Sequence, residues 1–263
     1  MILVFDVGNT ELTIGLFQES ELRGHWRIMT DVSRTPDEFG VLLRSLLAAS
    51  EFSPDVVDGV AIGSVVPRVT GPLAEGCQEY FAVGAPLIID ASSTLPITLD
   101  VDEPLTVGAD RLINTLAASR LHALDAIVVD LGTATTFDCI TSDGVFLGGV
   151  IAPGVATSSE TLTRRTSKLP ATELTIPKRV IGRRTEECIR AGVMFGAADA
   201  IDGIVARIKA EWPRPTAPMV IATGGMATTM AVLCKSFDRV DPYLTLSGLA
   251  IAHSLLAGGE PVL

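Results

Sequence analysis

Two short stretches of this sequence combine a carboxylate, a glycine and hydroxyl side chains at the end of an apolar run. Residues 6–10 read DVGNT, and residues 130–136 read DLGTATT. A glycine in such a turn lets phosphate oxygens approach backbone N–H groups, and threonine hydroxyls can add hydrogen bonds. An aspartate beside a phosphate is unfavourable unless a cation lies between them. With Mg²⁺ or K⁺ present, Asp6 and Asp130 become ligands, so the pattern favours nucleotide binding.

Each of these turns, taken alone, also fits a plain β-hairpin whose aspartate caps the turn. The second copy changes the balance, because Asp130 stands 124 residues after Asp6, close to half of the 263-residue chain. A further glycine turn, TGGMAT at 223–228, follows an apolar run and precedes a helical pattern. That arrangement suits a contact with the adenosine part of a nucleotide, although the turn by itself is weak evidence.

A third group of residues, TVGADRLIN at 106–114, could supply a base and a cation. Asp110 falls in the first turn of a predicted helix, next to Arg111. Aspartate is favoured at helix N-termini by the helix dipole alone, which is the simpler interpretation. Phosphoryl transfer to an alcohol, however, uses a carboxylate to accept the hydroxyl proton, and an anionic acceptor needs a cation to hold it. On the residues alone, both interpretations stay open.

The elements that would position these residues follow one order twice, β-β-β-α-β-α-β-α. Thr35, Pro36 and Glu38 predict a capped helix start. In the first half, strands are expected at 1–6, 12–18, 23–29, 57–67 and 86–90, and helices from Thr35, over 68–81 and from Gly108 to about Leu121. In the second half, strands are expected at 126–131, 134–141, 144–151, 219–223 and 238–241, with a short helix within 152–180, a long helix from Thr185 towards Trp212, a helix after 225 and a last helix over 245–257.

This duplication predicts an α/β fold of two domains, residues 1–121 and 122–263. Clefts between domains are favoured ligand sites. We therefore expect an interdomain cleft, with the two aspartate-glycine turns facing each other across it.

Composition excludes several classes of function. The net charge of −11 disfavours nucleic-acid binding, although a small anionic substrate remains compatible with it. No apolar run of about 18 residues occurs and no basic leader precedes Asp6, so neither a membrane span nor a secretory signal is expected. The four cysteines form no CxxC pair, which indicates a reduced, cytoplasmic protein without a zinc site. The three histidines stand alone and are expected to be structural.

Six motifs together carry a resemblance to a known family. They are DVGNT (6–10), GSVVP (63–67), VGADR (107–111), VVDLGTATTFD (128–138), FLGGVIAPG (146–154) and VIGRRTEE (180–187). In this order and spacing they resemble type III pantothenate kinase, and the resemblance runs from residue 1 to the last helix. GADR and DxGTATT together are highly specific, whereas DxGNT alone indicates only the wider acetate kinase, sugar kinase, Hsp70 and actin superfamily.

The resemblance implies two actin-like ATPase (ribonuclease H-like) domains, a homodimer, and ATP-dependent phosphorylation of pantothenate to 4′-phosphopantothenate, the first step towards coenzyme A. It implies that Asp110 is the general base and that Asp130 binds a monovalent cation, K⁺ or NH₄⁺, which acts alongside Mg²⁺. The implied ATP-binding residues are Asp6, Val7, Gly8, Asn9, Thr10, Glu11, Leu12, Thr13 and Thr133. The implied pantothenate-binding residues are Gly108, Ala109, Asp110, Arg111, which would face the substrate carboxylate, and Thr185, which would reach the site from the neighbouring subunit.

The sequence departs from the family pattern near the acceptor. Val101 stands where many members carry a tyrosine, Glu103 replaces a frequent asparagine, and Arg183-Arg184 replaces a common Lys-Asn. Contacts to the acceptor are therefore less well determined than contacts to ATP. Two alternatives remain: a catalytically weak regulatory or accessory relative of the family, and a kinase for another small hydroxy acid or for acyl phosphate chemistry.

Overall fold

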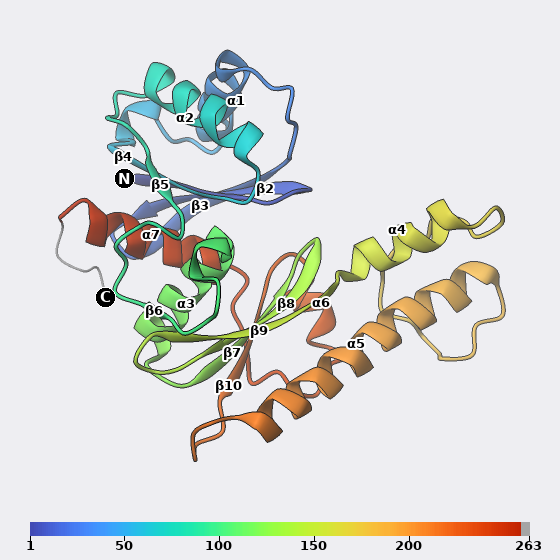
Figure 1. The fold of residues 1–263 in the computed structure, drawn as a ribbon. Helices are drawn as coiled ribbons and strands as arrows, with labels where there is room; N and C mark the ends of the chain where they lie inside the picture. Colours follow the sequence, from blue (N-terminus) through green and yellow to red (C-terminus); the bar gives the residue numbers. More distant parts are fainter. Residues whose placement is uncertain (259–263) are drawn as a thin grey trace. The chain divides into compact units, whose positions relative to one another are not determined.

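The computed structural model describes residues 1–258, and within them the chain forms two mixed β-sheets with helices packed on them (Figure 1). By Cα proximity the chain divides into two compact units. One unit holds Met1–His122, Gly144–Phe146 and the segment from Leu244 onward, and the other holds Ala123–Asp143 and Leu147–Tyr243. The two units are each made of more than one segment, whereas the sequence predicted two continuous domains with one boundary at 121/122. That boundary stays a prediction.

The first sheet has the strand order β3-β2-β1-β4-β5. Its elements are β1 (Ile2–Val7), β2 (Glu11–Gln18), β3 (Glu21–Met29), α1 (Pro36–Ala49), β4 (Gly59–Ser64), α2 (Pro67–Tyr80), β5 (Leu87–Ile89) and α3 (Ala109–His122), with short 3₁₀ turns at Pro54–Val56 and Pro104–Thr106. β1 is antiparallel to β2 and parallel to β4, so the end of β1 lies beside the start of β2 and the end of β4.

Helices cover both faces of the first sheet (Figure 1). On one face, Leu3 and Phe5 of β1 pack with Phe39 of α1 and Leu73 of α2 in a buried apolar cluster. The other face meets α7 (Leu244–Leu256) and α3. The predicted start of α1 is confirmed: the Thr35 hydroxyl accepts a hydrogen bond from the Glu38 backbone N–H, and the Glu38 carboxylate accepts one from the Thr35 N–H.

The second sheet has the order β11-β10-β7-β8-β9-β6. Its elements are β6 (Thr98–Leu99), β7 (Ala126–Leu131), β8 (Ala134–Ile140), β9 (Val145–Pro153), α4 (Val155–Arg165), α5 (Thr185–Glu211), β10 (Met219–Thr223), α6 (Ala227–Met230) and β11 (Arg239–Val240). Read from β9 to β11, the order repeats the topology of the first sheet. The predicted duplication is therefore confirmed, and the two-residue strand β6, which the sequence analysis missed, is an addition at the edge beside β9.

One face of the second sheet packs on the long helix α5. Ile127, Val129 and Leu131 of β7 join Val220 and Ala222 of β10 in a buried cluster with apolar residues of α5. Because side chains alternate along a strand, Val128 and Asp130 of β7 and Thr223 of β10 point to the opposite face. The residue before β7, Asp125, has a buried carboxylate that holds the start of this strand. It accepts hydrogen bonds from the Ser142 N–H (2.8 Å) and the Trp212 indole (3.2 Å).

Candidate active site

The turn between β1 and β2 exposes three residues to solvent and is flanked by two residues with buried side chains. The Gly8 N–H donates to the Glu11 carbonyl (3.1 Å), which closes the turn, and Asn9, Thr10 and Glu11 are exposed. The side chains of Val7 and Leu12 are buried in the apolar core. Of the residues 6–13 implied to bind ATP, these two could therefore contact a ligand only through their backbone.

A residue outside the predicted set braces this turn. The Thr30 N–H donates to the Thr10 carbonyl (3.0 Å), and the Thr30 hydroxyl donates to the Gly8 carbonyl (2.7 Å). Thr30 therefore binds two backbone carbonyls of the turn and fixes its conformation. The sequence signal was weak, since Thr30 is simply the first polar residue after a strand.

The corresponding turn between β7 and β8 is held by different means. The Gly132 N–H donates to the Ala134 carbonyl (3.0 Å). The Thr133 carbonyl accepts from the Gly154 N–H (3.2 Å) and from the Thr157 hydroxyl (2.7 Å), which ties the turn to the start of α4. Thr133 itself is exposed.

Two glycines make this second turn possible by close approach. A Cβ at Gly154 would collide with the Gly132 and Thr133 carbonyl oxygens. Gly224 has φ +87°, and a Cβ there would collide with a carboxylate oxygen of Asp130 and lie 2.8 Å from the Leu131 nitrogen. The predicted glycine turn at 223–228 thus lies directly against Asp130.

The first turn and the GADR segment belong to the same unit and meet at the end of β4. The Val65 N–H donates to the Val7 carbonyl (3.1 Å), and a Cβ at Gly108 would lie 3.5 Å from Val65 Cγ1. The motif GSVVP therefore joins the predicted phosphate turn to the N-terminus of α3. Two regions a hundred residues apart in sequence are brought to one place.

Asp110 lies in the first turn of α3, as predicted. Its carboxylate is partly buried and accepts a hydrogen bond from the Arg111 backbone N–H (2.9 Å). Burial raises the pKa of the Asp110 carboxyl above its ordinary value, while the N–H and guanidinium of Arg111 partly oppose that rise. A carboxylate with a raised pKa binds a proton more strongly, which suits a general base.

The Arg111 side chain is oriented by an aromatic ring. Its guanidinium carbon lies 4.9 Å from the centroid of the Phe146 ring, a cation–π arrangement that fixes a long side chain. The Asp100 N–H donates to the Phe146 carbonyl (2.9 Å), so the segment that carries Val101 runs beside this ring. Arg111 is thus held next to Asp110, as an anionic acceptor would require.

Thr185 is not in the unit that contains the GADR segment. It is the first residue of α5 and is exposed. The loop before it is folded onto the helix start, because the Glu187 carboxylate accepts hydrogen bonds from the Arg183 N–H (2.8 Å) and the Arg179 guanidinium (2.9 Å). These bonds lower the pKa of Glu187.

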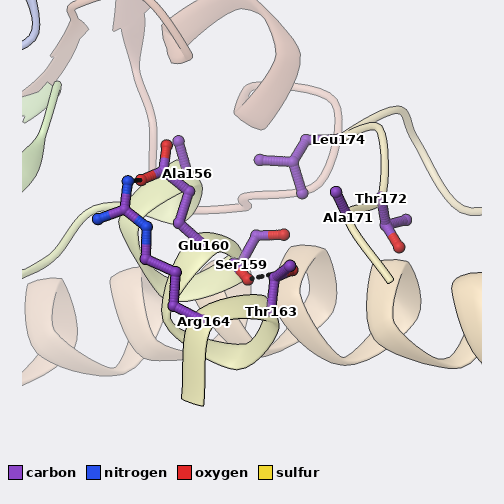
Figure 2. Close-up of a pocket in the computed structure, with 8 residues that line it drawn as sticks. All are labelled: Ala156, Ser159, Glu160, Thr163, Arg164, Ala171, Thr172 and Leu174. Carbon is purple, nitrogen blue, oxygen red and sulfur yellow. Dashed lines mark hydrogen bonds and ion pairs between the residues drawn. The ribbon is translucent and has the colours of Figure 1, made fainter. Parts of the chain in front are cut away.

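A hollow of about 250 Å³ lies between α4 and residues 171–174, and Figure 2 shows the residues that line it. Its lining is small or apolar, apart from the exposed ion pair between Glu160 and Arg164 (3.5 Å). None of the predicted site residues line it, and its one carboxylate, Glu160, is exposed and paired with Arg164. We assign it no part in catalysis.

Within residues 1–258 there is no cluster of three or more His, Cys, Asp or Glu side chains that could hold a metal ion. None of the helices described is long and apolar enough to cross a membrane.

Comparison with known proteins adds independent findings. The sequence model of the family described as type III pantothenate kinase matches residues 2–207. A protein of Anaeromyxobacter dehalogenans named type III pantothenate kinase is 42% identical over 253 residues, which is 96% of this chain and 98% of the relative.

Solved structures show the same fold at low sequence identity. A chain from Campylobacter jejuni, described as a Baf family transcriptional activator, matches with a TM-score of 0.58 and 19% identity, over 97% of this chain and 99% of the other. Component A of the (R)-2-hydroxyglutaryl-CoA dehydratase of Acidaminococcus fermentans matches with a TM-score of 0.56 and 10% identity, over 98% and 97%. These likenesses support an actin-like ATPase fold of two ribonuclease H-like domains.

Proposed function

Since this chain belongs to the type III pantothenate kinase family, we propose that it transfers the γ-phosphoryl group of ATP to the primary hydroxyl of pantothenate. The product is 4′-phosphopantothenate, and the reaction is the first step of coenzyme A synthesis. One observation within the chain carries the proposal furthest. The partly buried Asp110, with its raised pKa, lies beside Arg111 on a helix start that Val65 joins to a phosphate-type turn.

The proposed mechanism assigns a role to each of these groups. Backbone N–H groups of the 6–13 turn and the Thr133 hydroxyl bind the ATP phosphates. Gly108 and Ala109 leave room for pantothenate, and Arg111 binds its carboxylate. Asp110 accepts the hydroxyl proton as the oxygen attacks the γ-phosphorus in line. Positioning and electrostatics then supply most of the rate enhancement, as in other phosphoryl transfers.

Two cations are part of the proposal. The donor set fits them: Asp6 and Asp130 each end a buried strand beside a turn with N–H groups, so neither carboxylate could face phosphates without a counter-charge. Asp6 would help to hold Mg²⁺ together with the phosphates, and Asp130 would hold K⁺ or NH₄⁺. When bound, such ions neutralise charge on the phosphoryl group.

We also propose a homodimer in which Thr185 reaches pantothenate bound to the neighbouring subunit. The support is the exposure of Thr185 together with two apolar side chains in the loop before it, Val180 and Ile181, which are 69% and 82% exposed. Large exposed apolar side chains grouped in one loop are typical of interaction surfaces. The four cysteines are free thiols, which supports the cytoplasm as the proposed location.

A subunit-mixing experiment tests the shared site. Asp110→Asn and Thr185→Val homodimers are each expected to have little activity. After exchange of subunits, hybrid dimers hold one site with both native residues, so activity should recover. No recovery in dimers shown to exchange by mass spectrometry would refute the contribution of Thr185 across the interface.

A coupled assay of ADP formation tests the reaction itself. ATP should turn over with pantothenate in the presence of Mg²⁺ and K⁺, and much more slowly when K⁺ is replaced by tetramethylammonium. Other short hydroxy acids and acetate serve as controls for acceptor identity. Turnover with one of these and not with pantothenate would identify a different small-molecule kinase, and no turnover with any acceptor would favour an accessory protein.

A further inference from the structure

Three oxygen-bearing side chains lie in one row across the second sheet. Asp130 of β7 pairs with Thr136 of β8 on one side and with Thr223 of β10 on the other. Residues paired directly across neighbouring strands point to the same face of a sheet, and the strands are about 4.8 Å apart. Asp130 therefore stands between two threonines, on the face opposite to the apolar cluster packed on α5.

The hydroxyl of Thr223 is the unusual member of this row. The Thr223 side chain is only 1% exposed, and its Oγ1 has no hydrogen-bond partner among the residues that the structure describes. Burial of a hydroxyl without a hydrogen-bond partner destabilises the folded protein. A valine would fill the same space without that cost. The presence of a hydroxyl is therefore explained if its oxygen binds a ligand that is not part of the protein chain.

The surroundings of Thr223 restrict what that ligand can be. The following residue, Gly224, has φ +87° and brings its backbone against the Asp130 carboxylate, so the Asp130 carboxylate lies close to the end of β10 that carries Thr223. A hydroxyl oxygen beside one carboxylate offers two hard oxygen donors with a single negative charge between them. That donor set suits a cation of low charge, whereas divalent sites commonly collect several carboxylates.

We propose that Thr223 Oγ1 is a second protein ligand, with Asp130, of the monovalent cation. This inference rests on the proposed function, which assigns Asp130 to that ion, and it extends the site to the neighbouring strand β10. The hydroxyl donates a lone pair to the ion, and its proton is left to bond to water or to a nucleotide oxygen. Thr136 flanks Asp130 on the other side but is partly exposed, so water can replace its oxygen.

Thermal unfolding of the full chain tests the inference without an activity readout. Melting temperature is measured while KCl replaces tetramethylammonium chloride at constant ionic strength, because a ligand that binds only the folded state raises the melting temperature with its concentration. Thr223→Val removes the oxygen and keeps the shape, and Thr223→Ser is the matched control that keeps the hydroxyl. Thr223→Ala removes the same oxygen without adding a methyl group, in case the valine variant does not fold.

The expected result is that the K⁺ concentration for half of the melting-temperature rise increases about tenfold in Thr223→Val and Thr223→Ala, and stays near the wild-type value in Thr223→Ser. Half-points within about twofold of wild type in the valine and alanine variants would overturn the inference. A wild-type protein without a K⁺-dependent rise would overturn both the inference and the proposed cation site. Neither outcome decides whether the protein phosphorylates pantothenate with ATP, which the coupled assay measures separately.

Discussion

The two repeats place an aspartate at the same point of the same sheet topology, yet surround it with different side chains. In the first unit the row across the sheet is Thr13, Asp6 and Gly63, and in the second it is Thr136, Asp130 and Thr223. The space that a Cβ at Gly63 would occupy is filled by Ile113 of α3 and Leu249 of α7. The second row keeps a buried hydroxyl at the matching place.

This difference suggests how a duplicated fold divides its work. In the first unit, the glycine lets α3, which carries Asp110, pack against the end of β4. In the second unit, the matching position is the buried Thr223, so the row beside Asp130 stays polar. We infer that one copy holds the acceptor machinery and the other holds a counter-ion.

Gly224→Ala should have the largest effect on stability. The alanine would have to adopt φ +87° and would collide with Asp130 and with the Leu131 backbone, at a cost of about 3 kcal/mol in the free energy of unfolding. Urea denaturation followed by circular dichroism measures this cost. Gly192→Ala, at an open position on α5, is the matched control and should be neutral or stabilising. Equal stability of both variants would contradict the close packing on Asp130.

Gly63→Thr makes the first row resemble the second. The new side chain would collide with Ile113 and Leu249, so we expect about 2 kcal/mol of destabilisation and a displaced α3. Because α3 carries Asp110, turnover should fall further than stability alone explains, while ATP binding persists. Full turnover in a folded Gly63→Thr protein would show that the packing of α3 does not position Asp110.

Gly132→Ala compares the two turns directly. A Cβ at Gly132 has its nearest contact at 3.7 Å, whereas one at Gly8 would lie 3.0 Å from the Glu11 carbonyl oxygen. We expect Gly132→Ala to change the free energy of unfolding by no more than about 0.5 kcal/mol, and Gly8→Ala to cost about 1 kcal/mol. Both should weaken ATP binding, measured by calorimetry, because the methyl group blocks the approach of phosphate. Unchanged ATP affinity in Gly132→Ala would remove that turn from the nucleotide site.

The smallest effect concerns pH. Burial raises the pKa of Asp110, so the folded protein holds this proton more tightly than the unfolded chain does. Wild-type stability therefore falls as pH rises from the unfolded pKa through the folded pKa, and stays lower above it. Asp110→Asn lacks this group and should gain stability relative to wild type over that window. Urea midpoints at a series of pH values measure it, and a relative loss for the variant would contradict a raised pKa.

The fold was largely readable from the sequence because its signals are local. The capping box at Thr35 and the repeated strand-turn pattern at Asp6 and Asp130 depend on neighbours in the chain, and both are confirmed. Features that depend on distant partners were missed. The bracing of Gly8 by Thr30 and the approach of Gly154 to Thr133 join residues more than 20 positions apart, and β6 pairs with a strand 47 residues later.

For the candidate site, the residue types in the sequence predicted which residues could do the chemistry, but they did not predict which other residues surround them. Asp110 and Arg111 are placed together on α3 as expected, whereas the motif that begins with Phe146 gave no indication that its ring would contact Arg111. The role of Thr223 appears only when β10 is paired with β7, because its neighbour Asp130 lies 93 residues away. The residues assigned to ATP and to pantothenate, including Thr185, stay predictions.

The most direct test of the account compares wild type with Asp110→Asn in Mg²⁺ and K⁺, with 4′-phosphopantothenate measured by mass spectrometry and ATP affinity by calorimetry. The account predicts product from the wild type, and a fall in kcat of about 10²–10⁴-fold in the variant with nearly unchanged ATP affinity. Asparagine keeps the shape of the side chain but cannot accept the proton. A variant that forms product at close to the wild-type rate would show that Asp110 is not the base.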